Sequence, residues 1–242
     1  MRGRAVDAAS VEPAVLFSDD EVLAIAKPSG LATVPDRYDT ARAHVRAMLE
    51  PRWGRVWLVH RLDRDASGVL VLARTAAAHR ELNRQFELRE VRKTYLALVA
   101  GRPEWGERRI DAPLRPSGDR RHRTVVDPAC GKESVTEVRV LESFTRHALI
   151  EARPATGRAH QIRAHLAWAG HPILADPLYG GPTARIEAAE AIIARLALHA
   201  VRLELRHPAT GAPLVVEAPI ADDFAAALAT LSSSGRLGGA AR

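Results

Sequence analysis

The sequence has almost no cysteine: Cys130 is the only one among 242 residues. A single cysteine excludes an intrachain disulfide and any zinc or iron–sulfur site that needs several thiolates. Long apolar runs are also lacking, since no stretch approaches the roughly 18 to 20 residues that a helix needs to cross a bilayer. The first residues include arginines but no uninterrupted apolar segment behind them, so we expect no secretory signal. The expected compartment is therefore the cytoplasm.

Acidic residues are in the minority, with 29 Asp and Glu against 35 Lys and Arg and a net charge of +6. Such a surplus favours a polyanionic partner, most often nucleic acid, although some basic proteins bind no polyanion. The hydrophobic fraction of 47% is ordinary for a folded chain with a sizeable core. Charge alone leaves the partner open, so the placement of the arginines has to decide.

Predicted strands and helices alternate without a regular βαβ order, which indicates an α+β fold. We expect a single domain over residues 13–225, with mobile tails at 1–12 and 226–242. The expected elements are a hairpin at 14–27, helices at 40–50, 75–90, 159–170 and 185–198, strands at 55–62, 68–74 and 93–101, an arginine-rich loop at 102–123, an antiparallel pair at 134–155 and a strand pair at 199–219.

The stretch "VHRLDRDASGVLVLAR", residues 59–74, places Asp63, Asp65 and Gly68 at positions 1, 3 and 6 of a calcium-binding loop. Position 12 of such a loop must be glutamate, but it is Arg74 here, and the flanking segments are typical of strands rather than helices. The pattern therefore does not predict a calcium site. A zinc pair is not indicated either, because His160 and His165, five apart on a predicted helix, do not share a face.

Two carboxylates two residues apart could also serve a hydrolase, with Asp63 and Asp65 as the pair. His60, Arg61 and Arg64 surround them, however, and neighbouring arginines keep a carboxylate ionised. An ionised aspartate suits a nucleophile or a base better than a general acid. Taken alone, the stretch is equally compatible with a surface cluster of salt bridges at the end of a strand.

A second basic stretch, "TGRAHQIRAHL", begins a predicted helix with Arg158, His160 and Arg163 in its first turns. The N-terminal end of a helix, rich in arginine, can bind phosphate through charge and free amide groups. Together with the first cluster, it favours a binding cleft.

The combination of blocks resembles the RluA-type pseudouridine synthases. The signature of that family is His-Arg-Leu-Asp, two variable residues, Thr-Ser-Gly and an apolar strand, and residues 60–74 follow it. Four more blocks occur in the family's order: "DEVLAIAKPSGLATVP", "VRKTYLALVAG", "TGRAHQIRAHLAWAGHPILADPLYG" and "LALHAVRLELRHPATG". The resemblance covers roughly residues 13–224.

The resemblance implies the pseudouridine synthase fold, a mixed and largely antiparallel sheet with flanking helices and a central RNA-binding cleft. It implies an isomerase that converts specific uridines of structured RNA, in large-subunit rRNA, in a tRNA stem-loop or in both. Neither cofactor nor metal is expected, because the reaction neither adds nor removes atoms. We expect a monomer without an obligate protein partner. Few residues precede the first block, which is typical of the branch without a small N-terminal RNA-binding module.

The resemblance also implies roles for particular side chains. Asp63 is the expected catalytic carboxylate, whereas Asp65 stands at a variable position. Tyr95 is expected to stack on the flipped uracil and to take part in a late proton transfer, and Arg163 to pair with Asp63 and keep it charged. The expected substrate-binding residues are Arg61, which would fill the space that the flipped base vacates, Leu198 as part of an apolar wall, His60 and Arg158.

Two positions depart from the family pattern. Ala66 stands where the family has Thr, and Ala159 where it has Thr or Ser, so two hydroxyl groups that could bond to nearby backbone are lost. A non-catalytic RNA-binding or RNA-folding protein of the same fold remains the alternative. In either case, we expect arginines of the long loop to follow the RNA backbone: Arg120, Arg121 and Arg123.

Overall fold

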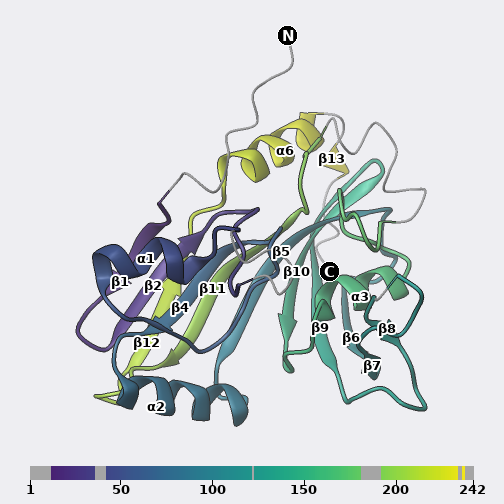
Figure 1. Ribbon diagram of the computed structural model, residues 1–242. Helices are drawn as coiled ribbons and strands as arrows, with labels where there is room; N and C mark the ends of the chain where they lie inside the picture. Colours follow the sequence, from purple (N-terminus) through teal and green to yellow (C-terminus); the bar gives the residue numbers. More distant parts are fainter. Residues whose placement is uncertain (1–11, 36–41, 122, 181–191, 234–235, 238–242) are drawn as a thin grey trace. The chain divides into compact units, whose positions relative to one another are not determined.

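The computed structural model describes residues 12–35, 42–121, 123–180, 192–233 and 236–237 (Figure 1). The chain divides into two compact units. Unit 1 runs to Val91 and includes Ala200–Pro219, and unit 2 comprises Arg92–His199 and the residues from Ile220 onward. A single domain over 13–225 stays a prediction, and the predicted tail at 1–12 lies almost wholly outside the described residues.

Unit 1 begins with the predicted hairpin, formed by β1 (Ala14–Ser18) and β2 (Val22–Lys27). The carboxylate of Asp19 accepts the N–H groups of Glu21 and Val22, both at 2.8 Å, and so closes the turn between the strands. Strand β4 (Ser67–Ala73) pairs antiparallel with β2, and all of its residues are buried. Both of its faces are therefore covered, as its continuous apolar sequence predicts.

The sheet of unit 1 continues from β4 to β11 (Leu198–Arg206), which pairs antiparallel with β12 (Pro213–Glu217). The short β3 (Trp57–Leu58) also pairs with β4. The helices of this unit are α1 (Val45–Trp53) and α2 (Ala76–Glu87).

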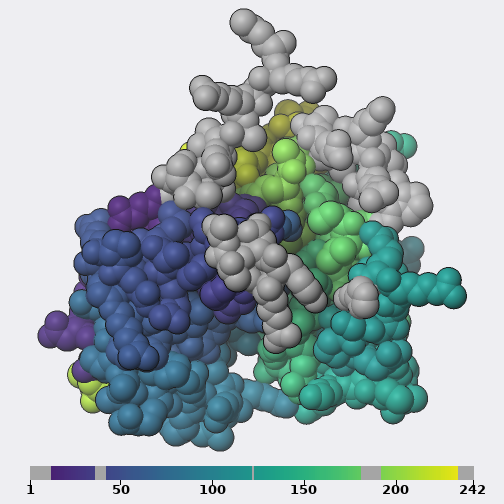
Figure 2. Space-filling view, viewed as in Figure 1, coloured from purple at the N-terminus to yellow at the C-terminus, as the bar shows by residue number. Residues whose placement is uncertain are grey.

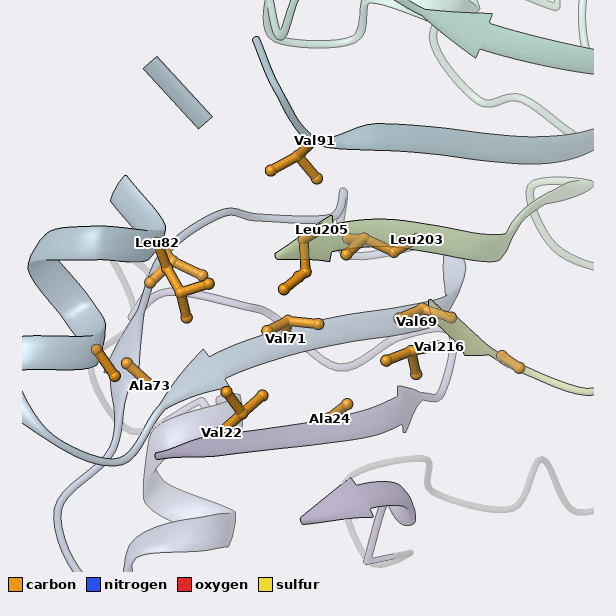
Figure 3. Close-up of a cluster of buried hydrophobic side chains, with 13 residues drawn as sticks. Val22, Ala24, Val69, Val71, Ala73, Leu82, Val91, Leu203, Leu205 and Val216 are labelled. Carbon is orange, nitrogen blue, oxygen red and sulfur yellow. The ribbon is translucent and has the colours of Figure 1, made fainter. Parts of the chain in front are cut away.

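Helix α2 begins where the sequence predicts, because the Thr75 hydroxyl accepts the N–H of Ala78 at 3.1 Å. Its buried Leu82 joins a cluster of small and branched side chains from β2, β4, β11 and β12 (Figure 3). This core cluster comprises Val22, Ala24, Val59, Val69, Val71, Ala73, Ala78, Leu82, Val91, Leu203, Leu205, Val216 and Ala218.

Unit 2 is built on three long antiparallel strands in the order β5–β10–β9. The alternating sequences at 134–155 form the predicted antiparallel pair. Strands β6 and β13 pair with β9, and β7 pairs with β8. The elements described in this unit are β5 (Arg92–Ala100), β6 (Glu107–Asp111), β7 (Leu114–Arg115), β8 (Val125–Val126), β9 (Val135–Phe144), β10 (His147–Pro154), α3 (Gln161–Trp168), α6 (Asp222–Ser233) and β13 (Arg236–Leu237).

The α+β class and the largely antiparallel pairing are confirmed, but three expectations about elements are wrong. The predicted tail at 226–242 begins inside α6, which buries Phe224, Ala227 and Leu231. The arginine-rich loop at 102–123 contains β6 and β7. Of the helix predicted at 185–198, residues 185–191 lie outside the described residues, and 192–197 form turns and irregular backbone. Among the described helices, none is both long and apolar enough to span a bilayer.

Candidate active site

Asp63 lies in unit 1, in an irregular segment between β3 and β4 that we call the Asp63 loop, residues 59–66. The predicted strand at 55–62 is shorter than expected because the chain leaves β4 after Leu58. His60 maintains the connection to β4, since its Nε2 accepts the N–H of Val71 at 2.9 Å. Its ring stacks on Phe86 of α2, with the ring centroids 4.9 Å apart. These two contacts anchor the start of the loop.

The residue before Asp63 is held by a single buried hydroxyl. Thr33 Oγ1 donates to the carbonyl oxygen of Leu62 at 2.8 Å and accepts the N–H of Leu62 at 3.2 Å. Thr33 is 3% exposed and Leu62 5%, so water does not compete for these bonds. Both backbone polar groups of Leu62 are thereby fixed, and with them the direction in which the chain enters Asp63.

The residue after Asp63 is held by a buried ammonium group. Lys27, at the end of β2, is 1% exposed, and its Nζ donates to the carbonyl oxygens of Pro28 and Leu31 at 2.8 Å and of Arg64 at 3.0 Å. Three carbonyl dipoles thus offset part of the cost of burying this charge.

The Lys-Pro-Ser-Gly turn after β2 supplies two more bonds to the loop. The N–H of Gly30 donates to the carbonyl oxygen of Arg64 at 2.9 Å, and the hydroxyl of Ser29 to that of Asp65 at 2.7 Å. Two sequence blocks that are far apart in the chain therefore form one rigid substructure around Asp63.

The missing hydroxyl at Ala66 does not open the loop. The N–H of Ala66 donates to the carbonyl oxygen of Asp63 at 3.2 Å, and the methyl group is buried at 1% exposure. The carboxylate of Asp65 pairs with Arg64 Nε at 3.0 Å. Arg61 is exposed, and Asp63 is half-buried.

Unit 2 contains the second group of predicted site residues. Among the charged residues of this group, Arg163 is the most buried. Arg163 Nε and Nη2 donate to the two carboxylate oxygens of Asp176, both at 2.8 Å. The side chains are 4% and 0% exposed, so this is a buried bidentate ion pair. It fixes the plane of the guanidinium group by two of its three nitrogens.

A buried polar network shapes the turn that leads into α3. Gln161 Oε1 accepts from the Thr156 hydroxyl at 2.7 Å and from the N–H of Arg158 at 3.0 Å, and its Nε2 donates to the carbonyl oxygen of Val135 at 2.9 Å. Gln161 thus bonds an N–H near Ala159, where the family hydroxyl is missing. Arg158 is half-buried, and its Nε donates to the carbonyl oxygen of Glu133 at 3.2 Å.

His160 precedes α3 in the left-handed conformation, with φ of 53°, and its Nδ1 lies 3.1 Å from the hydroxyl oxygen of Tyr179. The prediction of a phosphate-binding helix end is wrong for Arg163, which is 3% exposed. The predicted start of the helix at residue 159 is also wrong, because α3 begins only at Gln161.

The other two predicted residues of unit 2 lie on strands. Tyr95 is half-buried on β5, opposite Ala152 of β10. Leu198, at 4% exposure, is the first residue of β11, a strand whose residues from Ala200 onward belong to unit 1. Lys93 is two residues before Tyr95 and therefore on the same face of β5. Burial lowers the pKa of Lys93 to about 8, and its Nζ lies 3.4 Å from the carbonyl oxygen of Thr156.

The structure thus places the predicted residues in two groups: His60, Arg61 and Asp63 in unit 1, and Tyr95, Arg158, Arg163 and Leu198 in unit 2. Sequence reasoning missed the residues that bond directly to this set or to its neighbouring backbone, namely Lys27, Thr33 and Asp176. All three stand in blocks that resemble the family, but nothing in their spacing indicates which group each one bonds. Within the described ranges, no group of three or more His, Cys, Asp or Glu side chains is arranged to hold a metal ion.

Comparison with known proteins gives a consistent family. A family model described as RNA pseudouridylate synthase matches residues 21–168. The chain is 40% identical over 206 residues to the dual-specificity RNA pseudouridine synthase RluA of Escherichia coli (strain K12), covering 85% of this chain and 92% of that protein. It is 41% identical over 224 residues to the ribosomal large subunit pseudouridine synthase D of Nitrosomonas europaea, covering 88% of this chain and 64% of that protein.

Solved structures agree with these sequence relatives. The human RNA pseudouridylate synthase domain containing 4 has a TM-score of 0.74 at 26% identity, with 90% of this chain and 93% of that chain covered. The human domain containing 1 has a TM-score of 0.75 at 24% identity, with coverages of 98% and 100%, and this second likeness concerns the fold alone.

Proposed function

The chain belongs to the RNA pseudouridylate synthase family, and on this premise we propose that it converts specific uridines of structured RNA to pseudouridine with Asp63 as the catalytic carboxylate. The reaction breaks the bond between ribose and N1 of uracil and joins the same uracil to the ribose through carbon 5. One proton leaves carbon 5 and one is taken up at N1, so the atoms balance without a co-reactant. A carboxylate can start this sequence at the anomeric carbon, at the uracil ring or by proton abstraction that gives a glycal.

The observation that carries the proposal is the way the backbone on both sides of Asp63 is fixed. Thr33 holds Leu62, and Lys27 holds Arg64, through groups that are buried. A reacting carboxylate needs a defined position, because catalysis by orientation fails when the group is free to move. A surface aspartate in a salt-bridge cluster needs no such anchoring.

Arg163 and Tyr95 are proposed to act together with Asp63. Arg163 donates Nε and Nη2 to Asp176, which fixes the plane of its guanidinium group. As the family resemblance implies, we assign to this guanidinium group the role of keeping the carboxylate of Asp63 ionised. Tyr95 stacks on the uracil, and its hydroxyl serves the late proton transfer. Leu198 and Arg158 are assigned to the pocket wall and to substrate contact.

Arg61 is proposed to fill the space left when the uridine leaves its stack, a step that costs a few kcal/mol. Its exposure on the Asp63 loop suits this role. Arg61→Ala is expected to slow turnover on folded RNA more than on unstructured RNA, and an equal loss on both would refute the role. For His60 we propose a structural role, since its ring and Nε2 are engaged by Phe86 and Val71.

The substrate class follows from the relatives. The RluA relative is named dual-specificity and the other is named for the large ribosomal subunit, so we propose large-subunit rRNA, a tRNA stem-loop or both as substrates. Exposed Arg120 and Arg121 are assigned to the RNA backbone. Arg123 is not, because its guanidinium bonds to Asp119 and to the carbonyl oxygen of Leu178. A monomer and a cytoplasmic location stay predictions.

The decisive test is tritium release from RNA labelled at carbon 5 of uridine. The wild-type protein is expected to release label from total cellular RNA, Asp63→Ala to release none, and Asp65→Ala, the matched control two residues away, to remain active. If the wild type releases no label from any RNA pool but still binds RNA, the alternative of a non-catalytic RNA-binding protein is the correct one.

A further inference from the structure

Tyr179 lies at the centre of a set of contacts in unit 2 that none of the roles above uses. It is 8% exposed and packs against Leu114 and Ala164. Its hydroxyl oxygen accepts the N–H of Thr124 at 2.9 Å and shares a hydrogen bond of 3.1 Å with His160 Nδ1. Burial raises the pKa of Tyr179, so the hydroxyl keeps its proton at neutral pH. A buried phenol with two polar partners is a specific connector rather than a space-filler.

One side of this connector is the end of the arginine-rich loop, residues 115–121 and 123, together with Thr124. Asp119 closes the loop, since its carboxylate accepts the N–H groups of Arg121 and Arg123, both at 3.0 Å, and Arg123 Nε at 2.6 Å. Arg123 Nη1 then donates to the carbonyl oxygen of Leu178 at 3.2 Å, and its guanidinium lies 5.9 Å from the ring centroid of Tyr179. In Figure 2 the part of the chain around this loop is coloured teal, and its atoms lie at the surface.

The other side of the connector is Arg163. Its guanidinium lies 5.1 Å from the ring centroid of Tyr179. The carboxylate oxygen of Asp176 that accepts Arg163 Nη2 also accepts the N–H groups of Leu178 and Tyr179, at 2.9 and 3.0 Å. A shift of the backbone at 178–179 therefore moves the carboxylate that aims Arg163.

We propose that Tyr179 is a positioning residue that transmits the placement of the arginine-rich loop to Arg163. The inference rests on the proposed function, because it concerns the aim of a side chain assigned to catalysis. Arg120 and Arg121 on the same loop are assigned to the RNA backbone. Correct docking of RNA on the loop would thus be required for full alignment of Arg163, which links recognition outside the active site to the rate of the reaction.

The test separates rate from affinity in the full-length protein. Single-turnover rate constants are measured by tritium release with enzyme in excess, and dissociation constants by filter binding of the same RNA. Tyr179→Phe keeps the ring and removes the hydroxyl. We expect its rate constant to fall about tenfold, because the bonds of the hydroxyl to Thr124 and His160 are both lost, and its dissociation constant to stay within about twofold.

A double-mutant cycle tests the path from the loop. Asp119→Ala releases the loop, and combined with Tyr179→Phe it is expected to slow the reaction little more than either change alone, because both act on the same connection. The matched control is Asp223→Ala. Asp223, in the first turn of α6, accepts Arg195 Nε and Nη2, both at 2.6 Å, and has no described bond to the loop or to Tyr179, so its effect should multiply with that of Tyr179→Phe.

Two outcomes would overturn the inference: a wild-type rate constant for Tyr179→Phe, or effects of Asp119→Ala and Tyr179→Phe that simply multiply. If Tyr179→Phe lowers the melting temperature but leaves the single-turnover rate constant unchanged at temperatures well below it, Tyr179 contributes to stability alone. Failure of the proposed function is distinguishable from failure of this inference, because the wild-type protein itself would then release no tritium.

Discussion

Single residues of unit 1 show how side chains from another segment fix the backbone around Asp63, the proposed catalytic residue. Thr33 Oγ1 and Lys27 Nζ bond backbone groups of Leu62 and Arg64, and so fix the peptide groups on either side of Asp63. Side-chain bonds to the backbone are specific in direction and need no particular neighbour in sequence. The consequence is that activity should be sensitive to changes at residues that never meet the substrate.

Thr33→Val tests this sensitivity. Valine has the shape of threonine but leaves the N–H and carbonyl of Leu62 without their buried partner, which costs about 1–3 kcal/mol of stability. We expect a lower urea midpoint and a single-turnover rate constant that falls several-fold at temperatures where the protein is folded. Thr33→Ser, which keeps the hydroxyl, should behave like the wild type. A folded Thr33→Val protein with wild-type rate would contradict the role of this hydroxyl in aiming Asp63.

The buried Lys93 side chain makes the free energy of unfolding depend on pH in the alkaline range. Burial lowers its pKa from 10.5 to about 8, so the folded state binds this proton more weakly than the unfolded state does. Below about pH 8 the folded protein bears the full cost of a buried charge, and this cost is relieved as the pH rises from about 8 to 10.5. Lys93→Met should therefore stabilise the protein at pH 7, by an amount that shrinks toward pH 10. Urea midpoints of both proteins across this range give the difference, and a destabilised variant at pH 7 would contradict the argument.

Prediction from sequence names the residues that are proposed to carry the chemistry, but it misses those that fix their surroundings. Asp63 stands in a signature with few variable places, and an acid among arginines already excludes several alternatives. Asp176 and Tyr179 give no comparable signal, because their roles arise from a turn that returns to α3 only in the folded chain. Hydrogen bonds between segments far apart in sequence have no periodicity that a single sequence could reveal.

At the scale of elements, β4 is the strand on which the Asp63 loop is mounted, and Gly68 shows how closely it is packed. Its φ is +114°, and a Cβ atom at this position would lie 2.2 Å from the carbonyl oxygen of Ala200 on β11. Both the backbone conformation and the approach of the neighbouring strand exclude a side chain.

Gly68→Ala is expected to destabilise unit 1 by about 3 kcal/mol or more, since backbone strain adds to an overpacked contact. Gly211→Ala is the control, because Gly211 also has positive φ, +69°, but has no neighbouring atom within 4 Å of the added Cβ. Its cost should be only that of the left-handed conformation, about 1–2 kcal/mol. Chemical denaturation followed by circular dichroism measures both, and equal losses would show that strain alone decides.

Elements with a local signal were predicted well. Thr75 caps α2, the alternation at 134–155 gives the β9–β10 pair, and the apolar run at 68–74 gives a strand buried on both faces. Helix α6 was missed although Phe224, Ala227 and Leu231 recur at helical spacing, because the small and polar residues that follow are typical of a tail. Strand β6 was missed because exposed arginines outnumber its single buried residue, Ile110.

For the whole molecule, the net charge of +6 predicts RNA affinity that falls steeply with salt. Arg120 and Arg121 are exposed on the arginine-rich loop, and the bond that Arg121 Nη2 donates, to the uncharged carbonyl oxygen of Pro177 at 3.2 Å, leaves its charge uncompensated. The charge of Arg202 is instead compensated, since its guanidinium group pairs with Glu204 at 3.1 Å and with Glu217 at 2.5 Å. Only arginines of the first kind can release counterions from RNA.

Arg120→Ala and Arg121→Ala should each reduce the slope of log affinity against log salt by about 0.7 to 0.9, the range expected for one phosphate contact. Arg202→Ala, as the control, should leave the slope unchanged. Dissociation constants at several salt concentrations provide the slopes. Unchanged slopes for both loop variants would remove these arginines from the RNA contact.

Unit 1 is discontinuous in the chain, and this determines when it can fold during synthesis. Its core cluster needs Leu203, Leu205, Val216 and Ala218, which the ribosome adds only after all of Arg92–His199. At about 5–20 residues per second, the segment with the Asp63 loop waits roughly 5 to 20 s for these partners. The exposed apolar strands β2 and β4 are vulnerable to misassembly during that interval, so the anchored aspartate depends on a core that closes only after residues 200–219 have been made.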